Sequence, residues 1–365
     1  MTNQTSTKGD GWLFRRLGIA TVAAVYLLVL AGGIVRSTGS GMGCPDWPKC
    51  FGSWVPPTEV AQLPLRYQET YASKRQLKNE RLAGYLDKMG FGELAGRIRL
   101  DAGPEAGFNA TKTWIEYVNR LLGVLVGFLI FLTLVLSGRY WREDRTIFWV
   151  SLAAFGLVGV QGWIGSVVVS TNLLPGIITV HMLLAIAIVL LLIYAVARSY
   201  RGRMPEPRVA NKPFLNRLVL FALAISLAQV LLGTQVRESV DHAIRSLGYG
   251  GRAQWIDALG LSFYVHRSFS WLVLATHVYL IYQVRKNISG GGRLYKYAFA
   301  LLLVVGLEVA TGAAMAYLGV PAYLQPVHLL LAFAGIGIQF LILLVLNARP
   351  VTAEKDRMVG ARVLS

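Results

Sequence analysis

Hydrophobic residues gather in eight long runs that contain almost no charged side chains. The runs cover residues 17–35, 121–137, 147–169, 177–197, 218–236, 268–284, 297–317 and 327–347. Each run is close to the roughly 20 residues that a helix needs to cross about 30 Å of hydrocarbon. A secretory signal peptide would be a single short run at the start of the chain. The pattern therefore predicts an all-α membrane protein with eight transmembrane helices.

Composition and charge favour a membrane protein over one that binds nucleic acid. Of the 365 residues, 55% are hydrophobic and only 15% are charged, whereas soluble proteins carry about 25% charged residues. The net charge is +17, and the basic residues occupy alternate loops: 139–145, 198–217 and 285–296 are basic, whereas 170–176 and 318–326 contain no Lys or Arg. By the positive-inside rule, we expect an inner (plasma) membrane protein with both termini in the cytoplasm.

The two cysteines, Cys44 and Cys50, both lie in the first external loop, which runs from about 38 to 113. Disulfides form outside the cytoplasm, so we expect a bond between them, with two free thiols as the alternative. Helical sequence continues within this loop, for example over 66–89, but nothing in the sequence indicates what the loop does.

The chain also contains a hidden repeat. Asn119 and His181 are separated by 62 positions, and so are His266 and His328. The intervening residues align without a gap, and Arg36 at the end of the first run matches Arg237 at the end of the fifth. This predicts an N-terminal half (1–200) and a C-terminal half (201–365) of four spans each. An even number of spans gives both halves the same orientation, as two parallel four-helix bundles related by an axis along the membrane normal.

The repeat places one polar pair in each half, Asn119 with His181 and His266 with His328, at matching depth near the external face. Facing side chains in the core of a four-helix bundle are a common cofactor site. Neutral imidazole is an axial ligand of heme iron. The pairs therefore favour heme binding. The plainer alternative is that these side chains form hydrogen bonds between helices.

Charged residues surround the two pairs unequally. Arginines suit the carboxylates of heme propionates, although arginines near a membrane surface also simply extend to the interface. The four arginines at the external ends of the spans are Arg36, Arg120, Arg237 and Arg267. Glu116 lies one helical turn before Asn119, whereas its equivalent in the second half is Phe263. This asymmetry indicates a reactive first site and an electron-carrying second site, unless Glu116 is only a favourable acid at a helix start.

Two segments resemble motifs of the heme A synthase family: GIVRSTGSGMGCPDWPKC at 33–50, and WIEYVNR at 114–120. The resemblance implies oxidation of the C8 methyl group of heme O to a formyl group, through successive hydroxylations, giving heme A for terminal oxidases. It implies that His266 and His328 bind the iron of a resident heme B. It also implies that His181 binds the iron of the substrate heme and that Glu116 is catalytic.

Asn119 departs from this family pattern, because many members have histidine at that position. The resemblance then implies that the substrate iron is held by His181 alone or by His181 and water. The partners expected are heme O, heme O synthase, terminal oxidase assembly factors and membrane lipid, with a homo-oligomer left open and no nucleic acid. The rival interpretation is a quinone-linked diheme electron-transfer protein that leaves heme unmodified.

Overall fold

The computed structural model describes residues 11–100, 107–171, 173–201, 208–288 and 292–348. The part of the chain that it describes is helical and contains no β-strand, which confirms the predicted all-α class. Its elements are α1 (Trp12–Ser37), η1 (Val60–Gln62), α2 (Tyr67–Lys88), α3 (Gly92–Leu100), α4 (Ala110–Ser137), η2 (Gly138–Trp141), α5 (Arg145–Ser170), α6 (Pro175–Ser199), α7 (Lys212–Leu247), η3 (Tyr249–Gln254), α8 (Trp255–Ala258), α9 (Gly260–Asn287), α10 (Arg293–Tyr317) and α11 (Leu324–Leu346). The two termini, expected in the cytoplasm, lie outside the described residues.

Several of the long helices begin at a polar cap. The side chains of Asn109, Asp144 and Asn211 accept hydrogen bonds from backbone N–H groups in the first turns of α4, α5 and α7. Such caps satisfy donors that have no partner within the helix. Each helix therefore starts where its apolar run is preceded by Asn or Asp.

Seven of the described helices are long and apolar enough to cross a membrane: α1, α4, α5, α6, α7, α10 and α11. The protein is thus a multi-pass membrane protein. The apolar run expected at 268–284 lies within α9, which is as long as α4 but is not among the seven. Its polar residues, His266, Arg267 and His277 among them, lower its hydropathy.

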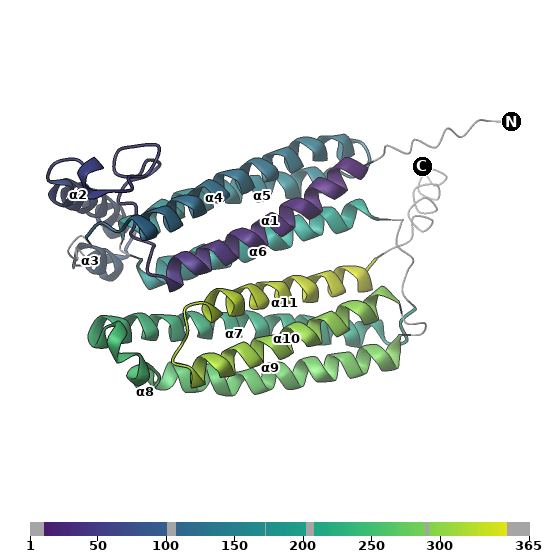
Figure 1. Cartoon of the computed structure of the whole chain (residues 1–365). Coiled ribbons are helices and arrows are strands. Elements are labelled where there is room, and N and C mark those ends of the chain that lie inside the picture. Colours follow the sequence, from purple (N-terminus) through teal and green to yellow (C-terminus); the bar gives the residue numbers. More distant parts are fainter. Residues whose placement is uncertain (1–10, 101–106, 172, 202–207, 289–291, 349–365) are drawn as a thin grey trace.

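The long helices pack in two groups (Figure 1). In one, α1 contacts α4 and α6, and α5 contacts α4 and α6; in the other, α7 contacts α9 and α11, and α10 contacts α9 and α11. The first group surrounds an apolar cluster that includes Ile130 and Leu192. The second surrounds a cluster that includes Leu215 and Leu301. Close van der Waals packing of these side chains stabilises each group, because lipid provides no hydrophobic driving force between membrane helices.

The two groups meet along α1, α6 and α11. Ile186, Phe333 and Ile336 are buried together at this contact. Gly33 of α1 lies so close to α11 that an added methyl group would come within 2.9 Å of the Cα atom of Pro326. A side chain at Gly33 would therefore force the two groups of helices apart.

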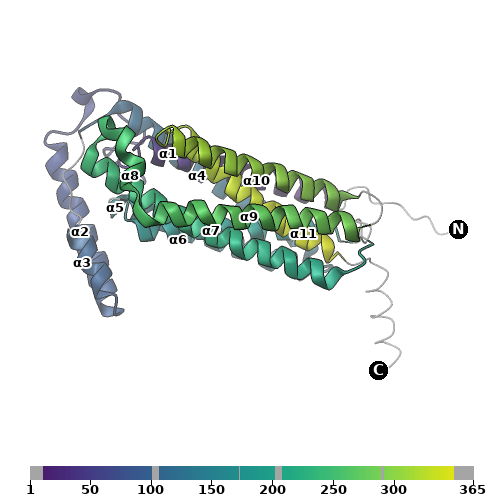
Figure 2. The same ribbon diagram turned by 90° about the horizontal axis from the view of Figure 1, so that it is seen from below.

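The helices α2 and α3 lie outside both groups. They form a hairpin at the end of the molecule where the Cys44–Cys50 disulfide lies, here called the disulfide end (Figure 2). Arg99 of α3 contacts Glu80 and Asp87 of α2 at 3.1 Å and 2.8 Å. In Figure 2 the hairpin runs across the direction of the long helices.

The close contact at Gly33 predicts a stability effect. We expect Gly33→Ala to lower the free energy of unfolding by about 1–3 kcal/mol, the usual cost of overpacking. The matched control is Gly123→Ala in α4, where an added methyl group meets nothing within 4 Å and removal of a helical glycine stabilises by about 0.5–1 kcal/mol. Thermal unfolding in detergent, followed by circular dichroism, would measure both. Equal shifts for the two variants would contradict the packing at this contact.

Candidate functional site

The structure brings the second histidine pair together. The ring centroids of His266 on α9 and His328 on α11 are 6.4 Å apart, with an angle of 76° between the ring planes. Imidazole nitrogen binds a metal ion at about 2 Å. Two such bonds, plus the distance from the binding nitrogen to the centroid in each ring, add up to nearly this separation. No group of three or more His, Cys, Asp or Glu side chains within the described residues could hold a bare metal ion. Heme iron needs only axial ligands from the protein.

The His328 ring has a hydrogen-bond partner that orients it. Its Nδ1 atom lies 3.0 Å from the Oγ1 atom of Thr311 on α10. A partner on one ring nitrogen leaves the other nitrogen for a metal ion and fixes the direction in which it points. His181, the equivalent residue in the first group, has no such contact: its buried Nδ1 atom has no hydrogen-bond partner. The two halves therefore hold their repeat-related histidines differently.

Each of the four repeat-related positions faces a glycine on a neighbouring helix. Methyl groups added at these glycines would lie 4.0 Å from Asn119 Oδ1 (Gly32), 3.6 Å from His181 Cε1 (Gly165), 3.3 Å from His266 Cε1 (Gly233) and 3.4 Å from His328 Cε1 (Gly312). Gly32 is equivalent to Gly233 in the repeat, and Gly165 to Gly312. The glycines therefore allow each of these side chains to lie close against a neighbouring helix, and a larger residue at the same position would push against it.

Several buried polar atoms around these positions lack a partner in the protein. They are Asn119 Oδ1, Gln161 Oε1, His181 Nδ1, Gln229 Oε1 and His266 Nδ1. The amide nitrogens of Gln161 and Gln229 donate to the backbone oxygens of His181 and His266, at 2.8 Å and 3.0 Å. Buried polar atoms nearly always have a partner. Their concentration at the two pairs fits sites that receive a further molecule, and the donor set fits heme.

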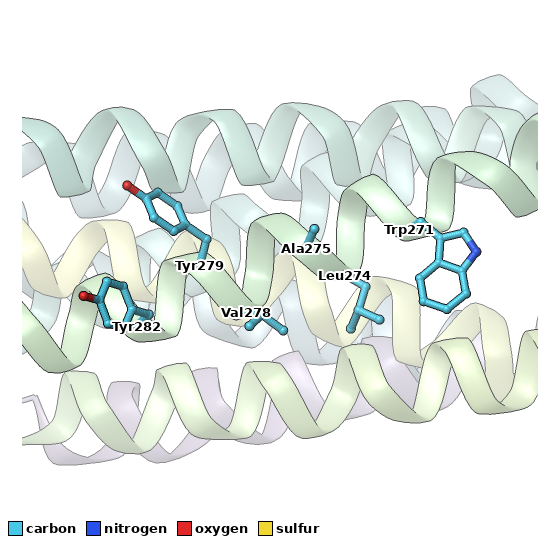
Figure 3. A pocket seen from close by; sticks show the side chains of 6 residues that line it. All are labelled: Trp271, Leu274, Ala275, Val278, Tyr279 and Tyr282. Atoms are coloured by element: carbon cyan, nitrogen blue, oxygen red, sulfur yellow. The ribbon is translucent and has the colours of Figure 1, made fainter.

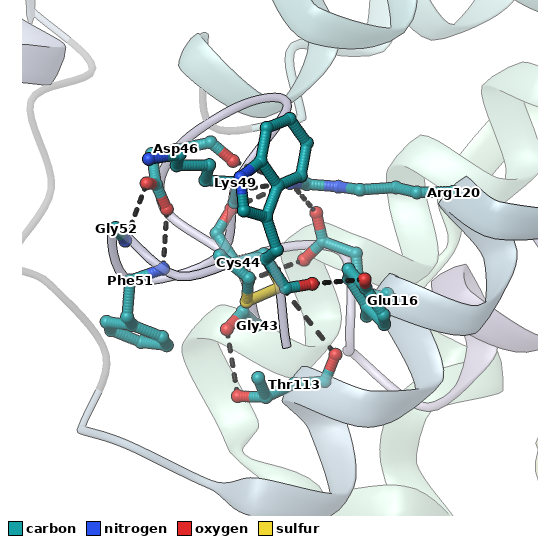
Figure 4. The surroundings of a disulfide bond; sticks show 12 residues. Gly43, Cys44, Asp46, Lys49, Phe51, Gly52, Thr113, Glu116 and Arg120 are labelled. Carbon is teal, nitrogen blue, oxygen red and sulfur yellow. Dashed lines mark hydrogen bonds and ion pairs between the residues drawn. A yellow bond between two sulfur atoms is a disulfide. The ribbon is translucent and has the colours of Figure 1, made fainter. Parts of the chain in front are cut away.

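Glu116 lies at the start of α4 and is 3% exposed. Its Oε1 atom forms an ion pair with Arg120, one turn further along the helix. Its Oε2 atom accepts a hydrogen bond of 2.8 Å from the backbone N–H of Cys44 (Figure 4). Both carboxylate oxygens are therefore fixed, one by a charge and one by the disulfide loop.

Arg120 connects this carboxylate to the disulfide loop. Its guanidinium donates to the backbone oxygens of Cys44 (2.8 Å), Asp46 (2.5 Å) and Lys49 (3.1 Å) (Figure 4). The expected disulfide between Cys44 and Cys50 is present and fully buried. The sequence suggested the glutamate motif and the cysteine motif separately. Only the structure shows that they form a single unit.

The other three arginines differ in their surroundings. Arg36 and Arg237 were expected in separate halves, but they meet where the two helix groups join and share one carboxylate, Asp241. Arg36 forms an ion pair with Asp241 Oδ2, and Arg237 contacts Asp241 Oδ1 at 2.7 Å. Arg237 also donates to Gln325 Oε1 at 2.5 Å. By contrast, Arg267 is exposed and lies over the rings of its helix neighbours Phe263 and Tyr264.

The sequence analysis missed Asp241, Thr311 and the glycine pair Gly32 and Gly233. The glycines could have been found, because extending the Arg36–Arg237 alignment by one helical turn aligns them. Asp241 could not, because it lies beyond the fifth apolar run, in a segment where α7 continues to Leu247. No pattern in the chain pairs it with Arg36.

A hollow elsewhere on the described surface lies along α9. It has a volume of about 530 Å³ and is lined by Trp271, Leu274, Ala275, Val278, Tyr279 and Tyr282 (Figure 3). Most of these side chains are exposed, and none is a carboxylate or an imidazole. The hollow fits an apolar surface in contact with lipid.

Comparison with known proteins identifies the family of the chain. The chain matches the family described as cytochrome oxidase assembly protein over residues 15–89 and 99–340. The chain belongs to this family. The match includes all four repeat-related positions, Glu116 and both cysteines, and covers both halves.

Curated relatives of this cytochrome oxidase assembly protein are similar over nearly their whole length. The heme A synthase of Caulobacter vibrioides is 25% identical over 339 residues, which cover 87% of this chain and 90% of the relative. The heme A synthase of Methylobacterium radiotolerans is 26% identical, covering 88% and 86%. That of Methylobacterium nodulans is 29% identical, covering 86% and 87%.

The hydrogen bonds of Arg120 predict that it holds the disulfide loop in place. Arg120→Ala leaves Glu116 buried without its opposite charge, an effect that costs about 3–5 kcal/mol in comparable buried pairs. We expect lower thermal stability and faster proteolysis near residues 43–53. The matched control is Arg267→Ala, the repeat-equivalent arginine, for which we expect at most about 0.5 kcal/mol because it is exposed. If both variants are cleaved at the same rate as the unsubstituted protein, Arg120 does not anchor the loop.

Proposed function

We propose that this protein is a heme A synthase, which oxidises the C8 methyl group of heme O to a formyl group. The observation that carries the proposal is the asymmetry between the halves. The second half has two imidazoles facing each other, whereas the first has a buried carboxylate held rigidly one turn from Asn119. Membership of the cytochrome oxidase assembly family and the names of the relatives support it.

We further propose that α9 also crosses the membrane, which gives eight spans in two parallel four-helix bundles. The helix contacts and the repeat-related glycines support this arrangement. The bundles correspond to residues 1–200 and 201–365. The distribution of basic residues supports cytoplasmic termini in the plasma membrane, with the disulfide end on the opposite side.

The second bundle is the proposed site of a resident heme B. His266 and His328 would bind its iron, and Arg237 and Arg267 lie at the end of the bundle where propionates would project. When bound, this heme supplies one-electron transfer. The hydrogen bond between the His328 ring and the Thr311 hydroxyl suits a permanent cofactor, because it holds the ligand in one orientation.

The first bundle is the proposed site of the substrate, heme O. His181 would bind the substrate iron, alone or with water, because the other repeat-related residue of this half, Asn119, is a poor iron ligand. A single strong ligand suits a molecule that must enter and leave. Arg36 and Arg120 lie at the same end, although both are engaged with protein carboxylates. In the reaction, the carboxylate of Glu116 would accept protons that the oxidation releases, and an acceptor outside this chain must take the electrons. Arg120 and the N–H of Cys44 keep that carboxylate in position beforehand.

The rival, a quinone-linked diheme electron carrier, would bind two hemes without changing either. An electron carrier would have no use for the Glu116 carboxylate, which is buried and held by two partners and has no acidic equivalent in the second half. The products therefore distinguish the two functions: a synthase converts supplied heme O into heme A, and a carrier does not.

Replacing the proposed catalytic carboxylate should stop the conversion. In cells supplied with heme O, we expect Glu116→Gln to lower heme A by about 100-fold or more, the usual contribution of a general acid or base, while the heme B content stays the same. Chromatography of extracted hemes measures both. Glu93→Gln, on the exposed surface of α3, is the control and should leave heme A unchanged. Normal heme A from Glu116→Gln would refute the catalytic role.

Filling the space beside His328 should remove the resident heme. We expect His266→Ala, His328→Ala and Gly312→Leu each to lower bound heme B at least severalfold, as measured by the heme absorbance of the purified protein. Gly306→Leu on the same helix is the control, because an added methyl group there meets nothing within 4 Å. Full heme occupancy in Gly312→Leu would show that the heme does not lie against this glycine.

A further inference from the structure

The hairpin of α2 and α3 has a segregated distribution of charge that the proposed function does not use. Lys74, Lys78, Arg81 and Lys88 recur at intervals of three, four and seven residues, which places them along one face of α2. All four side chains are exposed. The acidic residues of α2 lie on another side, where Arg99 of α3 pairs with Glu80 and Asp87. One face of α2 is therefore basic.

Apolar and aromatic side chains accompany the basic residues. Leu77 and Tyr85 lie along the same face and are 55% and 67% exposed. Met89 and Phe91, in the turn that joins α2 to α3, are 69% and 53% exposed. A helix face that combines Lys and Arg with large apolar side chains is typical of helices that lie in the interface of a membrane.

The position of α2 shows which way this face points. Lys74 and Lys78, from the first half of the basic face, line a small cleft together with Ser166, Val169 and Ser170 at the last turn of α5. The last turn of a membrane-spanning helix is where the bilayer surface lies. The start of the basic face therefore already lies at the level of that surface.

The rest of α2 continues past α5. In Figure 2 the hairpin runs across the long helices and extends beyond them on the side of α6 and α7. Arg81, Tyr85 and Lys88 continue the same face along this extension. A membrane surface at the level of the last turn of α5 would therefore lie next to this part of the hairpin.

We propose that the α2–α3 hairpin is a membrane-surface anchor that binds anionic phospholipid headgroups beside the bundle. Lys74, Lys78, Arg81 and Lys88 contact lipid phosphates, while Leu77, Tyr85, Met89 and Phe91 enter the headgroup layer. Each basic residue near an anionic surface is worth roughly a fivefold preference, and so the four together form a specific attachment. The anchor depends on the membrane setting of the protein and not on its reaction.

Fluorescence quenching by lipid tests this contact in the full-length protein. Tyr85→Cys on the basic face and Gln76→Cys on the acidic side each receive one fluorophore, since Cys44 and Cys50 are bonded and buried. The labelled proteins are reconstituted into phosphatidylcholine vesicles with or without phosphatidylglycerol, with some lipids brominated near the headgroup. We expect severalfold stronger quenching at position 85 than at position 76, and only in the anionic vesicles.

Added salt and replacement of the basic residues test whether the contact is electrostatic. Raising the salt concentration from 0.1 M to 1 M shortens the electrostatic screening length from about 10 Å to about 3 Å. Quenching at position 85 should then fall toward that at position 76. Replacing Lys74, Lys78, Arg81 and Lys88 by Gln should have the same effect at low salt. The salt series keeps all four basic residues, so it tests the proposal even if the fourfold variant does not fold.

Three results would overturn the proposal. One is equal quenching at positions 76 and 85. Another is quenching at position 85 that is the same in neutral and anionic vesicles. The third is protection of position 85 in native membranes without any quenching by lipid, which would assign the basic face to an acidic protein partner.

Discussion

Polar side chains inside a membrane need partners from the protein or from a ligand, because hydrocarbon offers none. The architecture of this chain depends on that constraint at one depth, where Asn119, His181, His266 and His328 project from four helices. Each has a glycine beside it, and most have buried polar atoms without a protein partner. The same constraint explains why α9 carries polar residues that lower its hydropathy below that of its neighbours. Two of those residues, His266 and His277, face other helices of the group.

The two halves use the same framework for different chemistry. In the second half, Thr311 orients one of two facing imidazoles. In the first half, the residue equivalent to Thr311 is Ile164, which has no hydroxyl group. The fixed polar group of this half is instead the Glu116 carboxylate. The second half thus has two neighbouring imidazoles, one of them oriented by a hydroxyl, and the first has an amide, one imidazole and a fixed carboxylate. This difference fits a permanent redox cofactor beside an exchangeable substrate.

The ion pairs of Arg36 and Arg237 with Asp241 tie the halves together at the disulfide end. A single carboxylate between two arginines leaves an excess of positive charge. Such a centre can attract further carboxylates, such as heme propionates. Because the arginines come from different halves, Asp241 links the two halves directly at this end.

The sequence by itself determined the helical class, the apolar runs and the spacing of the repeat-related polar residues. All of these depend on local hydropathy and on spacing along the chain, and both can be read from the sequence without knowing how the helices pack. Only the tertiary structure decided three other features. These are the linkage of Glu116 through Arg120 to the backbone of the disulfide loop, the sharing of Asp241 by two arginines, and the placement of the basic face of α2 beside the end of α5. The contacts of Glu116 and Arg120 with the disulfide loop, and of Arg36 with Asp241, join residues that are from 71 to 205 positions apart. They form between a side chain and a distant backbone, or between side chains on helices whose relative rotation no local pattern specifies.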